Sequence, residues 1–151
     1  MPTPQAKAAL QIVTVGNPNV GKSSLINALS GSDLKVGNWP GSTVQRLEVF
    51  SQWEGRAIHL VDLPGCYSLL GASAEETICR QELLRQAPDL ILNVVDATNL
   101  RRNLSLTLEL SELQIPMIVV LNLWDEFLKR EGHLDTEALS HRLGVPIVTT
   151  S

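Results

Sequence analysis

The residues best suited to chemistry lie in segment 16–23, which reads Gly-Asn-Pro-Asn-Val-Gly-Lys-Ser. This is the spacing of a phosphate-binding loop, in which glycines let backbone N–H groups turn toward phosphate and a lysine reaches the outer phosphates. A β-branched stretch at 11–15 precedes the segment and a helical pattern follows it, so a helix start would add its positive dipole end. The alternative is a simple glycine turn beside a surface lysine, which would need neither the preceding strand nor the following helix. The segment therefore predicts phosphate binding, with Lys22 on the phosphates and Ser23 on magnesium.

A second candidate is Asp62-Leu63-Pro64-Gly65, at the end of an apolar stretch, 56–61. Ligands of open α/β sheets bind at the carboxyl ends of strands. The Asp62 carboxylate is expected to hold a magnesium-bound water, and the Gly65 N–H to meet the terminal phosphate. Taken alone, so short a motif is equally compatible with an ordinary turn. Its place downstream of a phosphate loop favours the nucleotide site.

A third candidate, Asn122-Leu123-Trp124-Asp125, also ends a strand and predicts recognition of a guanine base. The Asp125 carboxylate would accept hydrogen bonds from the guanine amino group and ring N–H, a donor pair that adenine lacks. The alternative is an aspartate that ends a strand and caps the next helix. Segment 149–151 follows the last expected strand and would offer backbone N–H groups to the guanine carbonyl, unless it is a simple chain end.

The elements that must position these motifs follow from hydrophobic periodicity and turn residues. Segment 33–42 has no periodic apolar positions and is expected to be a mobile surface loop. Ser73 and Glu76 form a capping-box pattern at the start of a helix. Strands are expected at 11–15, 44–53, 56–61, 90–95, 116–123 and 146–149. Helices are expected at 22–30, where Gly31 would end the helix, from 73 to a point before Pro88, and at 136–143, where Gly144 would end it.

The leucine-rich segment 100–110 fits two patterns. Leu104, Leu106 and Leu108 alternate as in a strand, whereas Leu100, Leu104 and Leu108 have a helical spacing. The apolar strands on either side look like parallel neighbours, which need a crossover that is usually helical. A helix is therefore expected, and the order of elements predicts an α/β domain of the P-loop NTPase type. Its sheet should be mostly parallel with one antiparallel hairpin strand, and helices should cover both faces.

Composition limits the remaining possibilities. With 151 residues, 44% of them hydrophobic, the chain fits a single domain, 1–151. Its net charge of -4 makes a nucleic-acid partner unexpected. The longest apolar stretches, 90–95 and 115–124, are shorter than the roughly 20 residues of a membrane helix. Two cysteines without metal-ligand spacing favour a reducing compartment such as the cytoplasm.

These motifs, in this order, resemble the translation-factor-related class of P-loop GTPases. Segments 36–44 (Val-Gly-Asn-Trp-Pro-Gly-Ser-Thr-Val) and 62–69 (Asp-Leu-Pro-Gly-Cys-Tyr-Ser-Leu) are more narrowly similar to the switch segments of FeoB, a family of bacterial ferrous-iron transport proteins. The resemblance implies that Thr43 closes on magnesium and the terminal phosphate. It also implies that Asn19 helps to hold a potassium ion, although from its own sequence context Asn19 is equally a turn residue.

The resulting site has a catalytic part and a larger nucleotide-binding part. The catalytic residues are Lys22, Thr43 and Gly65. Magnesium ligands, direct or through water, are Ser23, Thr43 and Asp62. The nucleotide-binding residues are Asn17, Asn19, Val20, Gly21, Lys22, Ser23, Ser24, Gly41, Ser42, Thr43, Asp62, Gly65, Asn122, Leu123, Asp125, Thr150 and Ser151.

The sequence departs from the usual pattern in three places. Leu123 stands where many GTPases have a lysine that packs on the base, so fast nucleotide release is expected. Cys66 stands where many carry a water-orienting glutamine and FeoB proteins usually carry threonine; a small core residue without a catalytic part is the preferred interpretation. The chain also ends at Ser151, before the last helix of such a domain, so one sheet face is expected to be partly bare and to favour self-association.

The function expected from the resemblance is slow hydrolysis of magnesium GTP, as a regulatory switch for ferrous-iron uptake across the inner membrane. The domain would lie on the cytoplasmic side, beside the membrane permease of the same transporter. Two alternatives remain. A ribosome- or tRNA-associated GTPase would need a basic face, and a nucleotide-binding module without turnover would agree with the missing glutamine.

Overall fold

The computed structural model describes residues 9–30, 33–130 and 132–151, in which a seven-stranded sheet has the order β2-β3-β4-β1-β5-β6-β7. Strand β3 pairs antiparallel with both β2 and β4, and every other pairing is parallel. The expected α/β class, with one strand running against the rest, is confirmed. The strands are β1 (Leu10–Val15), β2 (Leu34–Asn38), β3 (Gln45–Trp53), β4 (Arg56–Asp62), β5 (Leu90–Asp96), β6 (Met117–Asn122) and β7 (Ile147–Thr149).

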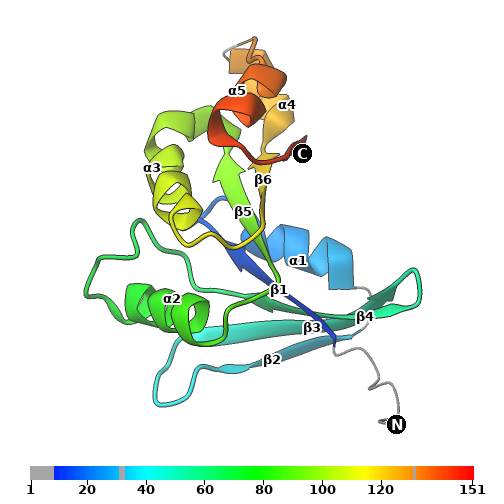
Figure 1. The fold of residues 1–151 in the computed structure, drawn as a ribbon, viewed down its shortest axis with the longest axis vertical. Helices are drawn as coiled ribbons and strands as arrows, with labels where there is room; N and C mark the ends of the chain where they lie inside the picture. The colour runs from blue at the N-terminus through cyan, green and yellow to red at the C-terminus, as the bar shows by residue number, and fades with distance from the viewer. Residues whose placement is uncertain (1–8, 31–32, 131) are drawn as a thin grey trace, which may run out of the picture.

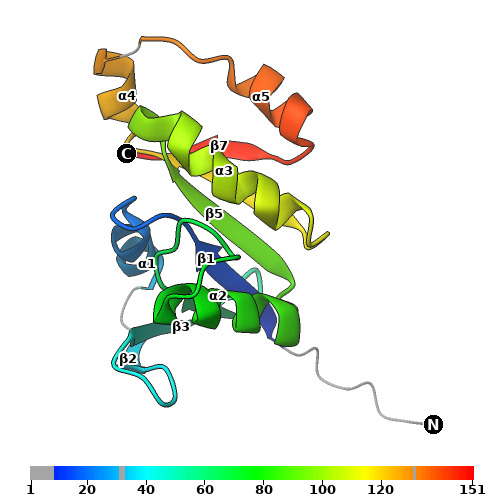
Figure 2. The ribbon, with the colours of Figure 1, turned by 90° about the vertical axis from the view of Figure 1, so that its left-hand side faces the viewer.

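Helices cover both faces of this sheet (Figures 1 and 2). Ile26 of α1 packs with Ile12 and Leu60 on one face, whereas Leu83 of α2 and Leu106 of α3 pack with Val13 on the other. The helices are α1 (Lys22–Ser30), α2 (Ala74–Arg85), α3 (Leu100–Ser111), α4 (Trp124–Arg130) and α5 (Thr136–Leu143), with a 3-10 turn η1 at Ala97–Asn99.

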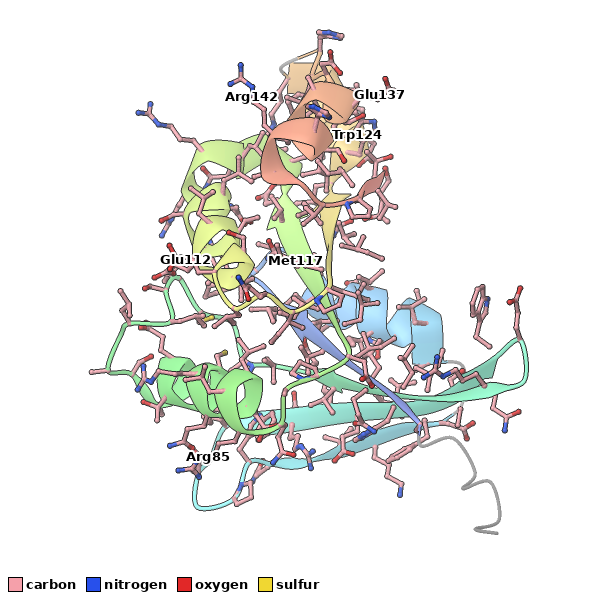
Figure 3. All side chains as sticks on the ribbon, in the orientation of Figure 1. Arg85, Glu112, Met117, Trp124, Glu137 and Arg142 are labelled. Carbon is pink, nitrogen blue, oxygen red and sulfur yellow. The ribbon has the colours of Figure 1, made fainter. Side chains whose placement is uncertain are left out.

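Side chains divide between core and surface as this layering requires. Met117, at the start of β6, is buried, whereas Arg85, Glu137 and Arg142 on the helices are exposed (Figure 3). The parallel strands β5 and β6 are buried along most of their length, which is typical of strands covered on both faces. This rigid centre carries at its carboxyl edge the loops that hold the candidate site.

Local sequence signals set several helix ends as expected. The Glu76 N–H donates to the Ser73 hydroxyl at 3.1 Å, so Ser73 is the N-cap of α2, which ends before Pro88. Gly144 ends α5 in the left-handed conformation, with φ 70°. The segment 100–110 lies within helix α3, as the crossover argument required. Gly31, expected to end α1, lies outside the described residues.

One expectation was wrong, and one helix was not expected. Segment 33–42 is not a loop throughout, because β2 pairs with β3 from Leu34 opposite Val49 to Asn38 opposite Gln45. The strand is at the sheet edge and mostly exposed, so it needs no alternation of apolar residues, and its glycine and asparagine are tolerated there. Helix α4 was also not expected. Its seven residues are too few to show a period, and it begins directly after Leu123, whose φ is 59°.

Candidate functional site

The phosphate loop connects the carboxyl end of β1 to the first turn of α1, as the sequence predicts. Asn19 and Gly21 both have positive φ, 64° and 90°, which folds the loop sharply before the helix. A Cβ on Gly16 would lie 2.4 Å from the carbonyl oxygen of Val94, so the loop packs directly on β5. This close packing leaves the loop little freedom to take another path.

Side chains of the loop differ in what they offer a ligand. Asn17 is buried, and its Oδ1 accepts no hydrogen bond from any described residue. Asn19, Ser23 and Ser24 are exposed at the mouth of the loop, while Val20 packs beneath it. A helix start with exposed hydroxyls and free N–H groups is a typical anion site. The loop therefore has the construction that phosphate binding requires.

A buried charge pair lies at the base of this loop. The Lys22 ammonium is 3.6 Å from Oδ1 of Asp62, and both side chains are 9% exposed. The β1–β4 pairing brings them together, because Asp62 ends β4 beside Thr14 of β1. The structure thus unites two of the three motifs, which are separated by 40 residues of sequence.

The residues near this pair fit a magnesium ion that is carried with a nucleotide. Across residues 9–30, 33–130 and 132–151, no group of three or more His, Cys, Asp or Glu side chains is arranged to hold a metal ion alone. Magnesium bound with phosphates needs only one or two protein ligands besides water. The Asp62 carboxylate and the exposed Ser23 hydroxyl supply oxygen donors of that kind.

The segment after Asp62 lies against the phosphate loop. The N–H of Cys66 donates to the carbonyl of Gly16 at 3.0 Å, and a Cβ on Gly65 would come within 2.8 Å of Pro18 Cα. Only glycine permits that approach. Cys66 itself is buried, and the neighbouring Cys79 thiol lowers its pKa against the opposing effect of burial, while the pKa of Cys79 is raised.

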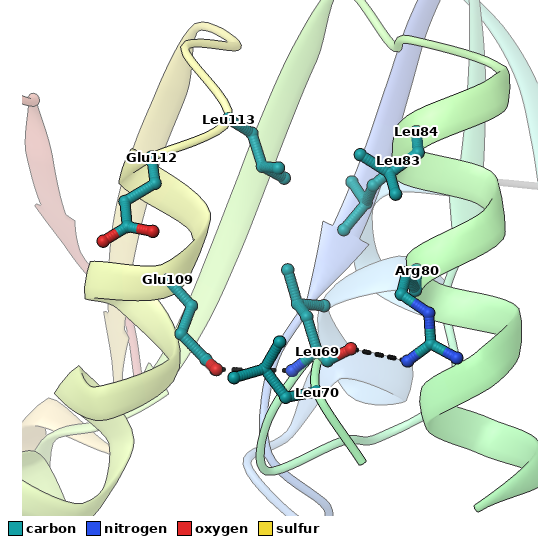
Figure 4. A pocket seen from close by; sticks show the side chains of 8 residues that line it. All are labelled: Leu69, Leu70, Arg80, Leu83, Leu84, Glu109, Glu112 and Leu113. Atoms are coloured by element: carbon teal, nitrogen blue, oxygen red, sulfur yellow. Dashed lines mark hydrogen bonds between the residues drawn. The ribbon is translucent and has the colours of Figure 1, made fainter. Parts of the chain in front are cut away.

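Beyond Cys66 the chain is fastened to α2 and α3 beside an apolar groove of about 200 Å³ (Figure 4). Glu109 accepts the Ser68 hydroxyl at 2.7 Å, and Arg80 donates to the Leu69 carbonyl at 2.7 Å. None of the predicted nucleotide-binding residues lines this groove, whose walls are Leu69, Leu70, Arg80, Leu83, Leu84, Glu109, Glu112 and Leu113. The groove therefore borders the segment after Gly65 without being part of the phosphate site.

The predicted base-binding motifs form one polar network with the phosphate loop. Asn122 donates from Nδ2 to the Val20 carbonyl at 2.9 Å, and its Oδ1 accepts the Thr150 hydroxyl at 2.9 Å. The Asp125 N–H donates to the Ser151 hydroxyl at 3.2 Å, which leaves the exposed Asp125 carboxylate beside the chain end. Segment 149–151 is thus hydrogen-bonded to both Asn122 and Asp125.

Thr43 is the exception among the predicted site residues. Within the described part of the chain no hydrogen bond or ion pair joins it to the phosphate loop. The turn between β2 and β3 lies on the far side of α2 from the loop after β1 (Figures 1 and 2). It is closed by the Trp39 N–H donating to Val44 at 2.9 Å, and the Trp39 ring is buried with Leu83 of α2. Gly41 and Ser42 remain with Thr43 in this turn.

Sequence reasoning missed two buried polar residues beneath the site. Thr14 donates its hydroxyl to Oδ1 of Asp62 at 2.6 Å, and Asn93 donates from Nδ2 to the Val15 carbonyl at 3.1 Å. In each strand the other buried residues are apolar. A polar residue in such a strand needs a partner, and that signal would have drawn attention to both.

The sequence matches the family described as ferrous iron transport protein B over residues 10–151. It is 49% identical over 140 residues to the Fe(2+) transporter FeoB of Helicobacter pylori strain J99, which covers 93% of this chain and 22% of that protein. It is 48% identical over 143 residues to the Fe(2+) transporter FeoB of Escherichia coli K12, covering 92% and 18%. The chain thus spans about a fifth of the length of these relatives. In the described residues we find no helix whose length and apolar character would let it span a bilayer.

Solved structures agree with this match. The G domain of the T. maritima FeoB iron transporter superposes with a TM-score of 0.88 at 40% identity, covering 95% of this chain and 88% of that one. A mutant of S. thermophilus NFeoB bound to mGDP gives 0.89 at 44% identity, covering 95% and 55%. The family match runs from residue 10 to residue 151, and the chain belongs to the FeoB family of ferrous iron transport proteins, whose G domain it resembles in fold.

Proposed function

We propose that this chain binds magnesium GTP and hydrolyses it slowly, as the switch domain of a ferrous-iron transporter. One observation carries the proposal: Asn122 ties the phosphate loop at Val20 to the corner at Thr150. A phosphate-binding loop and a guanine-reading carboxylate are thereby held in one rigid frame. The GDP-bound state of the S. thermophilus relatives gives independent support.

Each motif has a separate task in this scheme. Lys22 and the N–H groups before α1 hold the phosphates, and Asp125 accepts the two guanine donors. Ser23 and Asp62 would hold magnesium, which when bound neutralises charge on the phosphates. Thr43 would join them only after the β2–β3 turn moves, because that turn lies on the far side of α2 from the phosphate loop in this conformation. Such an ordering of a loop by the terminal phosphate is a common switching device.

Hydrolysis in this chain would proceed without a glutamine next to Gly65. The Cys66 side chain is buried and cannot orient water as a glutamine does. A potassium ion held by Asn19 would supply further positive charge, and the exposed position of Asn19 at the loop mouth is compatible with that role. The positive φ of Asn19 is equally typical of a turn residue. A comparison of GTP turnover in potassium and in sodium distinguishes the two roles.

The transporter context rests on the family. Relatives of this sequence are Fe(2+) transporters of which it spans about a fifth, and one of them is a fusion of Fe(2+) transport protein A with FeoB. The permease part of the same transporter is therefore the proposed partner, with the domain at the cytoplasmic face of the inner membrane. GTP turnover would then regulate iron passage through that part.

The direct test of turnover is phosphate release from magnesium GTP. Lys22→Ala should abolish it, because the phosphates lose their positive side chain. Lys129→Ala is the matched control, since Lys129 is 73% exposed on α4 and its ion pair with Glu126 is a surface pair at 3.9 Å. Circular dichroism of both variants checks folding. Full turnover in Lys22→Ala, or no turnover in the parent chain under any salt, would contradict the proposal.

A further inference from the structure

A threonine in the first strand lies directly behind the magnesium-site carboxylate. Thr14 pairs with Asp62 in the parallel β1–β4 register, and the Leu63 N–H donates to the Thr14 carbonyl at 3.0 Å. The Thr14 side chain is fully buried, and its hydroxyl donates to Oδ1 of Asp62 at 2.6 Å. The short distance is typical of a hydroxyl donating to an ionised carboxylate.

The two oxygens of the Asp62 carboxylate are used unequally. Oδ1 accepts the Thr14 hydroxyl and lies 3.6 Å from the Lys22 ammonium. Oδ2 has no hydrogen bond or ion pair with any residue that the structure describes. The carboxylate is therefore held by one oxygen, which leaves the other available to a ligand.

We propose that Thr14 is a positioning residue, whose hydroxyl fixes the Asp62 carboxylate so that Oδ2 is available to the hydration shell of nucleotide-bound magnesium. The inference rests on the proposed function, because it assumes that magnesium binds beside Asp62. A lysine alone would not fix the carboxylate, since an ammonium is a flexible point charge. A β-branched side chain in a strand has restricted χ1, so the Thr14 hydroxyl keeps its direction.

A purely structural role for Thr14 predicts a different result. In that case loss of the hydroxyl would lower stability and nucleotide affinity whether or not magnesium is present. A positioning role changes the magnesium requirement and spares the metal-free affinity for nucleotide. The two roles therefore separate in a binding experiment that varies magnesium.

The experiment measures release of fluorescent GDP from the whole chain as magnesium is titrated, with EDTA as the metal-free point. Thr14→Val keeps the shape of the side chain and removes the donor. It should need about tenfold more magnesium for half-maximal slowing of release, as is usual when a partner of a metal ligand is removed. Thr14→Ser should need about as much magnesium as the parent chain, because the donor is retained.

The control is Thr107→Val, which removes another fully buried hydroxyl, one that donates to Asn93 and not to a carboxylate. Its magnesium requirement should equal that of the parent chain. Thermal unfolding with GDP, with and without magnesium, gives a second readout, in which Thr14→Val should lose most of the gain that magnesium provides. An unchanged magnesium requirement in Thr14→Val, or an equal loss of GDP affinity in EDTA, would overturn the inference. Failure of the parent chain to bind GDP would instead refute the proposed function.

Discussion

Gly21 is the position where one added methyl group should do most damage to the candidate site. Its φ is 90°, and a Cβ there would lie 2.2 Å from Nδ2 of Asn122. That nitrogen donates to the Val20 carbonyl at 2.9 Å, so the methyl group and the hydrogen bond cannot coexist. We therefore expect Gly21→Ala to separate the phosphate loop from the predicted base-binding residues around Asn122.

The expected loss of unfolding free energy in Gly21→Ala has two parts. A left-handed backbone costs a non-glycine residue about 1–2 kcal/mol. Displacing Asn122 breaks a buried hydrogen bond and leaves its partners unpaired, which costs about 1–3 kcal/mol more. Gly55→Ala isolates the backbone cost, because Gly55 has φ 77° in the β3–β4 turn and no atom of the described residues outside that turn lies within 4 Å of the added methyl carbon.

Urea unfolding without nucleotide measures the loss of stability in both variants, and titration with fluorescent GDP measures affinity. Gly21→Ala should lose about 2–5 kcal/mol of unfolding free energy and bind GDP much more weakly. Gly55→Ala should lose only the backbone part and keep its affinity. Equal losses of stability in the two variants would refute the proposed contact between position 21 and Asn122.

Three further changes test separate parts of the site and its support. Asp125→Asn should weaken GTP binding and strengthen xanthosine triphosphate binding, because the donor pattern reverses at that edge; competition binding would show an equal loss of both if the assignment is wrong. GTP turnover should be higher in potassium than in sodium at equal ionic strength, and Asn19→Ala should remove the difference; phosphate-release rates that are equal in both salts would refute the cation. Burial raises the pKa of Glu82, with a smaller opposing effect of Arg46, so its ionisation destabilises the fold as pH rises through that pKa. Glu82→Gln should therefore unfold at a higher temperature than the parent chain at pH 7, with the gap closing below about pH 4; a gap independent of pH would contradict this.

The strongest sequence signals were those in which a motif and its context agree. The phosphate loop was predictable because glycine spacing, a preceding strand and a following helix all point to one geometry. Helix α3 was predictable only through topology, because its leucines fit both periods. Parallel pairing of β5 with β6 requires a crossover connection, and such a connection is usually a helix.

The parts that could not be predicted depend on contacts between distant segments. Strand β2 is exposed and contains Gly37 and Asn38, so its identity comes from pairing with β3 and not from its own residues. The burial of Trp39 against α2 likewise follows from tertiary packing. Thr14 is a polar residue next to the apolar residues of β1, but the sequence does not reveal that its partner is Asp62, 48 residues away.

The measurement that bears most directly on function is competition for fluorescent GDP on the unmodified chain in magnesium. If the phosphate loop and Asp125 form one guanine nucleotide site, unlabelled GTP should displace the probe completely and ATP should not displace it at comparable concentrations. Adenine lacks the amino and ring N–H pair that Asp125 accepts. Equal displacement by ATP and GTP, or no binding of the probe, would contradict the account.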